Sequence, residues 1–258
     1  MIIGSTEWEK IIIKGAKDLG INIDKKSTKL FAAHADELVK WNKAVNLTSI
    51  TDPFDIAVKH YIDSIYPVSL VVPKGVFSIL DMGSGGGFPG IPLKIMLPDI
   101  SFTLIDSSRK KVGFLKHIIR SLNLNNITAH QVRAEFFFND TNFKPFDIII
   151  CRAFSSLKNI AEKSLPLLGE NGTIFAMKGH CLDKEIDSLS LLNQSSNQSS
   201  MGQSSMGIGK KGLHMSIKKY TLPFIGAKRT VVMLKQTNLK VLSFRIFSNY
   251  FVCKKGLT

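Results

Sequence analysis

A run of glycines between two apolar segments is the part of the sequence most suited to binding a small molecule. Residues 80–93 begin at the end of one apolar segment, turn through the glycines and enter a second apolar segment. The glycines are Gly83, Gly85, Gly86 and Gly87. Glycine has no side chain to clash with a ligand lying against the backbone, and such a turn between a strand and a helix is typical of nucleotide-cofactor sites. The pattern therefore predicts a cofactor-binding loop.

Two carboxylates indicate which class of cofactor this loop would bind. Asp81 ends the first expected strand, directly before the glycines, and Asp106 ends the next expected strand. A carboxylate at the second position can accept hydrogen bonds from both hydroxyl groups of a ribose. Asp81 would repel the pyrophosphate of a dinucleotide, whereas it would attract the ammonium group of S-adenosylmethionine. The pattern resembles the S-adenosylmethionine methyltransferases of Rossmann-like fold more than it resembles nicotinamide-dependent oxidoreductases.

Short apolar segments alternate with helical patterns through the middle of the chain, which predicts a parallel sheet with helices on both faces. The expected strands are 76–81, 101–106, 127–130, 145–151 and 172–177, and the expected helices are about 89–97, 108–122, 134–138 and 156–168. Two more strands, 217–222 and 230–234, would form an antiparallel hairpin. The expected fold is α/β, a Rossmann-like methyltransferase fold with a mostly parallel seven-stranded sheet. Ligands bind beyond the carboxyl ends of parallel strands, where Asp81, Asp106 and Arg152 all fall.

The chain is expected to have three parts. Residues 1–70 form an N-terminal helical extension packed on the core, residues 71–236 form the methyltransferase domain, and residues 237–258 form a basic C-terminal extension. A Gln/Ser repeat at about 188–212 has almost no apolar content to bury and is expected to be a flexible insertion. The expected helices of the first part are one capped by Thr6, one capped by Ser27 or Thr28, and one over about 54–68.

The composition favours a soluble globular protein of the cytoplasm. Hydrophobic residues make up 44% of the chain and charged residues 21%, and no apolar stretch is long enough to span a bilayer. The N-terminus lacks the pattern of a secretory signal. The cysteines, Cys151, Cys181 and Cys253, lie far apart without metal-ligand spacing, which argues against a zinc site or a disulfide framework.

Positive charge is concentrated toward the C-terminus. The net charge is +14, and no acidic residue occurs from Ser188 to Thr258. One-sided charge of this kind favours a polyanionic partner, with nucleic acid ahead of an anionic membrane surface. A Lys-rich solvated terminus would give the same composition, so charge alone does not decide between the two interpretations.

Motifs spread along the chain make the assignment more specific. They are residues 41–48 (Trp-Asn-Lys-Ala-Val-Asn-Leu-Thr), His60, residues 62–65, the glycine loop with residues 88–93, residues 106–115, 133–135, 151–154 and 177–179, and Lys228 with Arg229. In these motifs the sequence resembles the glucose-inhibited division protein B family, bacterial enzymes that methylate guanine N7 in small-subunit ribosomal RNA. The resemblance covers about residues 30–235, without the Gln/Ser repeat.

The resemblance implies S-adenosylmethionine as the cofactor and 16S ribosomal RNA, or the small-subunit particle, as the partner. It also leads us to expect a monomer that uses no metal and no membrane. The cofactor-binding residues expected from the loop, its two acids and the resemblance are Asp81, Gly83, Gly85, Phe88, Asp106, Ala134, Glu135 and Arg152. Arg152 is also implied to position cofactor and substrate for catalysis, and Arg133, Lys178 and Arg229 are implied to contact RNA.

Other interpretations of these residues stay open. Phe88 could be an ordinary core residue, and Glu135 could form a structural ion pair with Arg152. His60 and Trp41 have no sequence partner at catalytic spacing, so they are interpreted as packing residues. The chain could also methylate another RNA or a small molecule, or it could be a non-catalytic RNA-binding protein.

The chemistry of guanine N7 limits what the protein must supply. N7 is an unprotonated lone pair near neutral pH, so its methylation needs no general base, and catalysis would rest mostly on in-line positioning. Arg152 stays charged and is expected to orient the base or the cofactor. Because O6 and N7 of guanine both accept hydrogen bonds, Arg152 or Arg133 could contact O6 while N7 stays free. Cys151 is not expected to act as a nucleophile.

Overall fold

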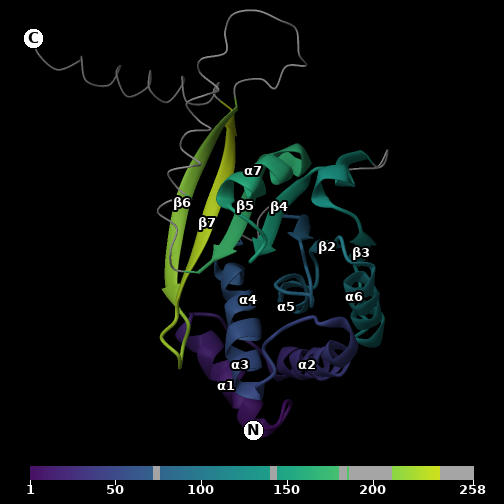
Figure 1. The fold of residues 1–258 in the computed structure, drawn as a ribbon. Helices are drawn as coiled ribbons and strands as arrows, with labels where there is room; N and C mark the ends of the chain where they lie inside the picture. The colour runs from purple at the N-terminus through teal and green to yellow at the C-terminus, as the bar shows by residue number, and fades with distance from the viewer. Residues whose placement is uncertain (72–75, 140–143, 180–184, 186–210, 239–258) are drawn as a thin grey trace, which may run out of the picture.

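The computed structural model describes residues 1–71, 76–139, 144–179, 185 and 211–238. In this part of the chain, seven strands form one sheet in the order β3-β2-β1-β4-β5-β7-β6 (Figure 1). The strands are β1 (Ser78–Met82), β2 (Ser101–Asp106), β3 (Ile127–Gln131), β4 (Phe146–Arg152), β5 (Leu168–Lys178), β6 (Lys211–Thr221) and β7 (Lys228–Asn238). The first five are parallel to one another, and β7 pairs antiparallel with both β5 and β6. The expected mostly parallel seven-stranded sheet is confirmed.

The order of the strands creates a crevice at one edge of the sheet. The chain runs outward from β1 through β2 to β3 and then crosses back to β4, which pairs with the other side of β1. At such a reversal the connections leave the sheet toward opposite faces, and a crevice opens beyond the carboxyl ends of the two strands. Gly83 follows β1 at this edge, and Arg152 ends β4 beside it.

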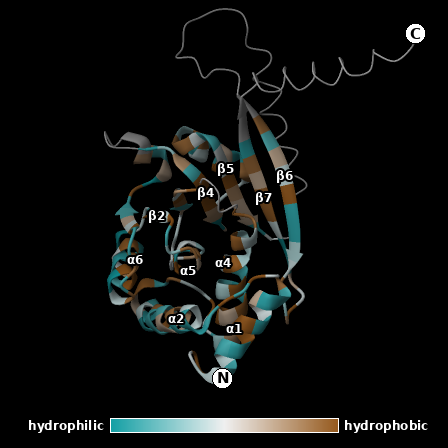
Figure 2. Cartoon of the chain, turned by 180° about the vertical axis from the view of Figure 1, so that it is seen from behind, coloured by the Kyte–Doolittle hydropathy of each residue, from teal (hydrophilic) through white to brown (hydrophobic). Residues whose placement is uncertain are grey.

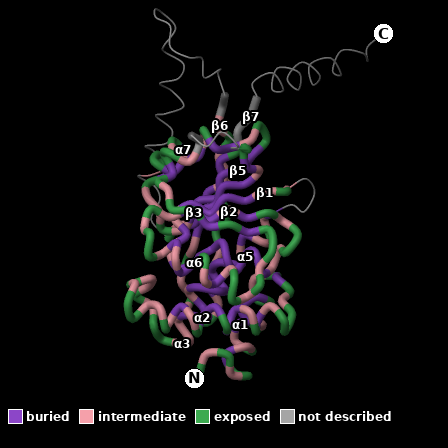
Figure 3. The backbone as a smooth tube through the Cα atoms, turned by 90° about the vertical axis from the view of Figure 1, so that its right-hand side faces the viewer, coloured by how far each residue is buried: buried purple, intermediate pink, exposed green. Residues whose placement is uncertain are grey.

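Alternate residues of the central strands face two hydrophobic clusters. In β4, Ile148 and Ile150 belong to one cluster, and Ile149 and Cys151 belong to the other. A strand buried on both faces needs apolar residues at every position, which explains the continuous apolar run in its sequence. The central strands are accordingly purple, the colour of buried residues, in Figure 3, and β4 is largely brown, the colour of hydrophobic residues, in Figure 2.

Helices cover both faces of the sheet. The helices that follow the first strands are α5 (Gly90–Met96), α6 (Arg109–Ser121), the 3-10 helix η3 (Ala134–Asn139), α7 (Leu157–Ser164) and the 3-10 helix η4 (Leu165–Leu167). Side chains of α5 and α6 belong to the first cluster, and side chains of α7 belong to the second. The helix expected over 156–168 is shorter, because Pro166 cannot continue an α-helical hydrogen-bond ladder and the chain tightens into η4.

The N-terminal helices α1 (Thr6–Asp18) and α2 (Lys25–Val45) begin earlier than their expected caps would place them. Ser5, and not Thr6, caps α1, and its hydroxyl accepts the Trp8 N–H at 3.3 Å. Asp24, and not Ser27 or Thr28, caps α2, and its carboxylate accepts the Ser27 N–H at 2.7 Å. Aspartate is a strong N-cap, so the residues before the expected caps join the first turn of α2.

The segment expected as one helix over 54–68 changes its helical type along its length. It consists of α3 (Pro53–Asp55), the π-helix η1 (Ile56–Ile62), α4 (Asp63–Ile65) and the 3-10 helix η2 (Tyr66–Ser69). A π-helix is wider than an α-helix and often occurs at functional sites. Together with α1 and α2, this segment packs under the sheet in Figure 1, and Trp8, Phe31 and Tyr61 share a hydrophobic cluster with strand residues such as Ile79 and Leu104.

The C-terminal hairpin is longer than expected. β6 begins at Lys211, inside the range expected as the Gln/Ser insertion, and β6 and β7 pair over their whole length. The turn between them lies at 222–227, close to the expected position. The rest of the expected insertion and the C-terminal extension from residue 239 lie outside the described residues. No helix within the described ranges is both long and apolar enough to cross a membrane.

Candidate functional site

The glycine loop closes over the carboxyl end of β1. Gly83 has a φ of +79°, a conformation that side-chain-bearing residues rarely adopt, and a Cβ atom there would lie 2.5 Å from the ring of Phe154. Two carboxylates hold the rest of the loop: Asp106 accepts the Gly85 N–H at 3.0 Å, and Asp81 accepts the Gly90 N–H at 2.9 Å. The glycines are therefore needed for the shape of the loop itself as well as for access by a ligand.

Asp81 lies beneath the loop, fully buried. Its Oδ2 accepts the Gly90 N–H, its Oδ1 has no hydrogen-bond partner among the described residues, and burial raises the pKa of this carboxyl to about 7. The side chain does not line the cleft above it. The structure thus places this expected cofactor-binding residue in a supporting position, where it anchors the start of α5.

A cleft of about 440 Å³ opens beside the loop, between the ends of β1, β2, β3 and β4. We call it the glycine cleft; its lining includes Gly83, Asp106, Arg133, Ala134, Glu135 and Phe154. Five of these six residues were expected as site residues from the sequence. Phe154 was expected only as part of a family motif, although its ring covers Gly83 and forms part of the cleft wall.

Asp106 is the carboxylate that faces the glycine cleft. Besides the Gly85 N–H, it accepts the Ser108 N–H at 2.8 Å through Oδ1. Each carboxylate oxygen can accept a second hydrogen bond, so both remain available to hydroxyl groups in the cleft. Two backbone donors fix the side chain in place, with acceptor positions left toward the cleft.

Glu135 is a second acid at the glycine cleft. Its Oε1 lies 2.7 Å from Lys163 Nζ, and the hydrogen bond from Lys163 lowers the pKa of the carboxyl below its usual value. The ion pair between Glu135 and Arg152 that the sequence left open is not observed. Arg133 also lines this cleft, whereas Lys178 and Arg229, which were grouped with it as RNA contacts, do not.

A second pocket of about 530 Å³ lies on the other side of the end of β4. We call it the arginine pocket; its lining includes Thr48, His60, Asp63, Arg152, Lys178 and Arg229. Ala153, which has a φ of +50°, lines both the arginine pocket and the glycine cleft. The two openings therefore meet at the residue that follows β4.

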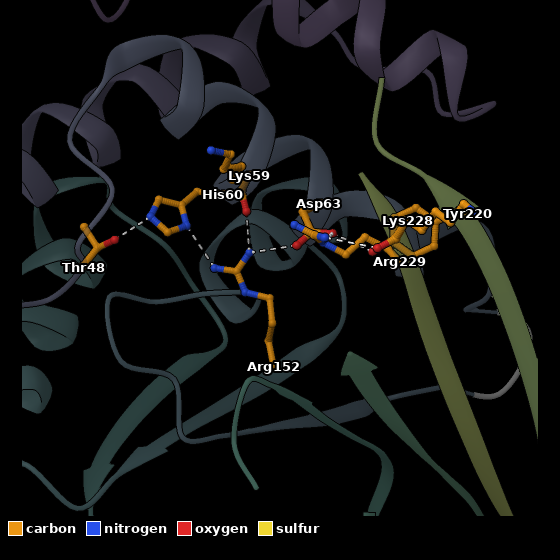
Figure 4. Close-up of polar contacts among 8 residues, drawn as sticks. All are labelled: Thr48, Lys59, His60, Asp63, Arg152, Tyr220, Lys228 and Arg229. Atoms are coloured by element: carbon orange, nitrogen blue, oxygen red, sulfur yellow. Dashed lines mark hydrogen bonds and ion pairs between the residues drawn. The ribbon is translucent and has the colours of Figure 1, made fainter. Parts of the chain in front are cut away.

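Arg152 is fixed in the arginine pocket by several partners from the π-helical segment (Figure 4). Its NH1 donates to the Lys59 carbonyl oxygen at 2.9 Å and lies 3.4 Å from Asp63 Oδ2, and its NH2 donates to His60 Nδ1 at 3.1 Å. The guanidinium carbon lies 5.1 Å from the centre of the Phe88 ring. The side chain is only 16% exposed, so its orientation is set by the protein.

Asp63 connects two arginines across the pocket. Its Oδ2 faces Arg152, while its Oδ1 accepts the Tyr220 hydroxyl at 2.6 Å and lies 3.5 Å from Arg229 Nε. Burial, together with the carboxylate of Asp63, raises the pKa of the Tyr220 hydroxyl. One buried carboxylate between two guanidinium groups leaves the cluster with a net positive charge, which suits an anionic or electron-rich ligand.

His60 has partners that its position in the sequence did not reveal. Its Nε2 lies 2.8 Å from the Thr48 hydroxyl, and its ring stacks on Phe88 with centroids 4.4 Å apart. Burial and the nearby Arg152 guanidinium lower the pKa of His60 to about 3, so the ring is neutral near pH 7. The sequence could not indicate these contacts, because the loop after α2, the glycine loop and the end of β4 approach η1 only in the folded chain.

Phe88 and Cys151 are both buried near the site. Phe88 is 6% exposed and packs on His60 beneath Arg152, so it supports the arginine pocket and does not line the glycine cleft. Cys151 is buried, and burial raises the pKa of its thiol to about 12. A protonated, buried thiol agrees with the expectation that this residue is no nucleophile.

Two neighbours hold Lys178 at the arginine pocket. Lys178 Nζ donates to the Ser155 carbonyl oxygen and lies 2.9 Å from Glu185 Oε2, so this amine is held by the loop after β4. Groups of three or more side chains that could bind a metal are absent from the described residues.

Two solved structures that share the fold are described as O-methyltransferases, one of them as putative. A putative O-methyltransferase from Klebsiella pneumoniae superposes with a TM-score of 0.53 at 11% identity and covers 90% of this chain and 98% of that chain. An O-methyltransferase from Bacillus cereus, solved in complex with SAH, superposes with a TM-score of 0.53 at 14% identity and covers 87% and 96%. At such identities the likeness shows the fold alone.

Sequence relatives are more specific. A ribosomal RNA small subunit methyltransferase G from Desulforamulus reducens is 34% identical over 224 residues, which are 86% of this chain and 88% of that protein. One from Salmonella schwarzengrund is 43% identical over 172 residues, which are 67% and 80%. The model of the GidB family, described as rRNA small subunit methyltransferase G, matches residues 27–211. The chain belongs to this family of S-adenosylmethionine-dependent methyltransferases.

Proposed function

We propose that this enzyme transfers a methyl group from S-adenosylmethionine to N7 of a guanine in 16S ribosomal RNA, with the cofactor in the glycine cleft and the guanine in the arginine pocket. The observation that carries the proposal is that the two openings meet at Ala153. The proposed sites of the methyl donor and of its acceptor would therefore be neighbours. Methylation of another RNA or of a small molecule is the alternative, but the positive charge around the second pocket favours a nucleic acid.

The residues of the glycine cleft fit S-adenosylmethionine. Asp106 would accept hydrogen bonds from the ribose hydroxyls, and Glu135 with the backbone N–H of Ala134 would face the adenine edge. Gly83 would let the methionine part lie against the loop. Asp81 and Gly85 would act indirectly, because both are bonded within the loop and neither lines the cleft.

The proposed mechanism relies on positioning. S-adenosylmethionine supplies an electrophilic methyl group on a sulfonium centre. Guanine N7 attacks with its own lone pair, so the protein has no proton to remove. The arrangement agrees with this requirement, since His60, a possible base in the arginine pocket, has its Nδ1 occupied by Arg152. Arg152 would order the pocket wall beside Ala153 so that the base lies in line with the methyl group.

The basic residues would hold the RNA around the base. Lys178 and Arg229 line the arginine pocket, each tied to an acid that limits its motion. Arg133 lies at the glycine cleft, so we propose that it contacts the cofactor side of the bound RNA. Phosphate contacts of this kind position the substrate but do not read its sequence.

The test is methyl transfer to the proposed acceptor. Small-subunit particles and their RNA from cells that lack this gene would be incubated with the purified protein and S-adenosylmethionine labelled in its methyl group. Borohydride treatment and aniline cleavage would then locate 7-methylguanosine. We expect one labelled guanine. Label in another nucleoside, or no transfer by a protein that binds the cofactor, would contradict the proposed acceptor.

A further inference from the structure

Thr48 is held rigidly at the arginine pocket by a motif that the function proposed so far does not use. Asn42, near the end of α2, accepts the Thr48 N–H at 2.9 Å and donates to the Thr48 carbonyl oxygen at 2.9 Å. Asn46, with φ and ψ of 52° and 58°, ends the helix in the left-handed conformation and turns the chain back. The motif at residues 41–48 thus places one hydroxyl group in the pocket lining.

The hydroxyl oxygen of Thr48 has two neighbours that can donate to it. The Ile50 N–H donates to Oγ1 at 3.0 Å. His60 Nε2 lies 2.8 Å from the same oxygen, and here the direction of the hydrogen bond depends on the tautomer of the ring.

Arg152 determines that tautomer. A guanidinium group only donates hydrogen bonds, so His60 Nδ1, 3.1 Å from Arg152 NH2, must accept and carries no proton. In the neutral ring the proton then resides on Nε2, which donates to Thr48. Burial and Arg152 keep the pKa of His60 at about 3, so the ring keeps this single tautomer near pH 7.

The Thr48 hydroxyl is consequently left with one unused hydrogen-bonding role, that of a donor. A hydroxyl oxygen accepts two hydrogen bonds, and both positions are taken by Ile50 and His60. The hydroxyl proton has no acceptor among the described residues, and Thr48 lines the arginine pocket. The hydroxyl can therefore donate to a ligand in the pocket but cannot accept from it.

We propose that the Thr48 hydroxyl donates a hydrogen bond to O6 of the target guanine and thereby selects guanine over adenine. This inference rests on the proposed function and names how the same pocket reads its base. Guanine presents the acceptor O6 next to N7, whereas adenine presents an N6 amino donor at that position. An amino group would meet a hydroxyl that has no acceptor site left, and N7 remains free to attack.

Thr48 fits this role better than the arginines considered from the sequence. NH1 and NH2 of Arg152 are engaged with Lys59, Asp63 and His60, and Arg133 lines the other cleft. Arg152 instead acts on the base through His60 and Thr48, as a positioning residue.

The experiment compares two bases at the target position in two enzymes. Small-subunit RNA would be assembled with either guanine or 2-aminopurine, which keeps N7 but lacks O6, at the methylated position. The kcat/KM for methyl transfer would be measured with wild type and with Thr48→Val, in which a methyl group replaces the hydroxyl. Differences in the intrinsic reactivity of the two bases cancel when the ratio of rates is compared between enzymes.

We compare kcat/KM for guanine with kcat/KM for 2-aminopurine in each enzyme. We expect this guanine-to-2-aminopurine ratio to be roughly fivefold to tenfold higher in wild type than in Thr48→Val, the value of one hydrogen bond. Thr48→Ser keeps the hydroxyl and should keep the wild-type ratio. A merely structural role for Thr48 would lower both rates together and leave the ratio unchanged. If Thr48→Val loses cofactor binding, Thr48→Ala, which adds no group in place of the hydroxyl, carries the same comparison.

Two results are distinguished by this design. If wild type is active and Thr48→Val shows the same guanine-to-2-aminopurine ratio, the role of Thr48 is overturned and the proposed function stays intact. The same holds for Thr48→Ala where that variant is used. A wild type that binds S-adenosylmethionine but transfers no methyl group to guanine overturns the proposed function, and the role of Thr48 with it.

Discussion

Three aspartates near the two openings of this enzyme have different structural roles. Asp63 orients two arginines in the arginine pocket, whereas Asp106 leaves acceptor sites open to the glycine cleft. Asp81, the third acid near the loop, does neither, because it is buried and bonded to Gly90. Residues of one type near one another thus differ in role because their burial and partners differ.

Asp106→Ala should weaken binding of S-adenosylmethionine by roughly tenfold to a hundredfold, the range for losing hydrogen bonds to a charged group. Isothermal titration would measure the dissociation constant. Glu170→Ala removes an acid that lines a different pocket, near the amino ends of β4 and β5, and should leave affinity unchanged. An Asp106→Ala enzyme that binds the cofactor like wild type would show that the ribose lies elsewhere.

At the scale of elements, the N-terminal helices hold the glycine loop in place. His34 on α2 lies with Nε2 3.0 Å from the Gly86 carbonyl oxygen and with Nδ1 3.0 Å from the Tyr61 hydroxyl. A carbonyl only accepts, so Nε2 donates to Gly86 and Nδ1 accepts from Tyr61. The π-helix η1 supplies Tyr61 as well as Lys59 and His60, two partners of Arg152, so the same helices support both openings.

Protonation of His34 should destabilise the fold in acid. Burial lowers the pKa of His34 to about 4, below its usual value of 6.5. The unfolded chain therefore binds more protons between these values, and the free energy of unfolding falls as pH drops from 6.5 to 4. His34→Gln, which keeps a donor for Gly86, should reduce this slope by up to about one proton in urea unfolding at a series of pH values.

His60 titrates over an overlapping range and keeps its own share of the slope in that variant. A slope that is identical in His34→Gln and wild type would mean that His34 is not buried as a neutral ring.

Much of this arrangement could be predicted from the sequence, and the failures have a common cause. The sheet and most of the glycine cleft follow from local signals: apolar strands, glycines and an acid at each strand end. The partners of His60 could not be predicted, because Thr48, Phe88 and Arg152 are far from it or from one another in the sequence and meet only in the fold. The buried position of Asp81 could not be predicted either, because it depends on how α5 packs beside the end of β1. The caps of α1 and α2 were misplaced because several polar residues compete at each helix start.

At the scale of the whole molecule, the hairpin of β6 and β7 extends the basic surface away from the arginine pocket. Lys219 and Lys228 are exposed, and they line a shallow depression that shares Tyr220 and Arg229 with the arginine pocket. Part of the positive charge of the chain, which has a net charge of +14, therefore lies on a surface that continues from the proposed base site. RNA held along this surface would bring its target base to the pocket.

Salt should weaken binding of the RNA substrate, and the double variant Lys219→Ala/Lys228→Ala should reduce that dependence. Two lost phosphate contacts would lower the slope of log K against log salt by roughly 1.4 to 1.8. Fluorescence anisotropy with labelled RNA at several salt concentrations measures the slope. Lys116→Ala/Arg120→Ala removes equal charge from α6, at the other end of the sheet, and should keep the wild-type slope. Equal slopes in the two double variants would place the RNA elsewhere.

The central claim is that cofactor and base occupy two separate openings and that Arg152 belongs to the base side. The most direct measurement is a single-turnover assay with Arg152→Ala, in which S-adenosylmethionine is bound first and RNA is then added. We predict a cofactor dissociation constant within about threefold of wild type and methyl transfer slower by at least about a hundredfold, because the base loses its alignment. Arg152→Lys keeps the charge but not the planar fork and should not restore the rate. A rate within about threefold of wild type, or a loss of cofactor binding that parallels the loss of rate, would contradict this account.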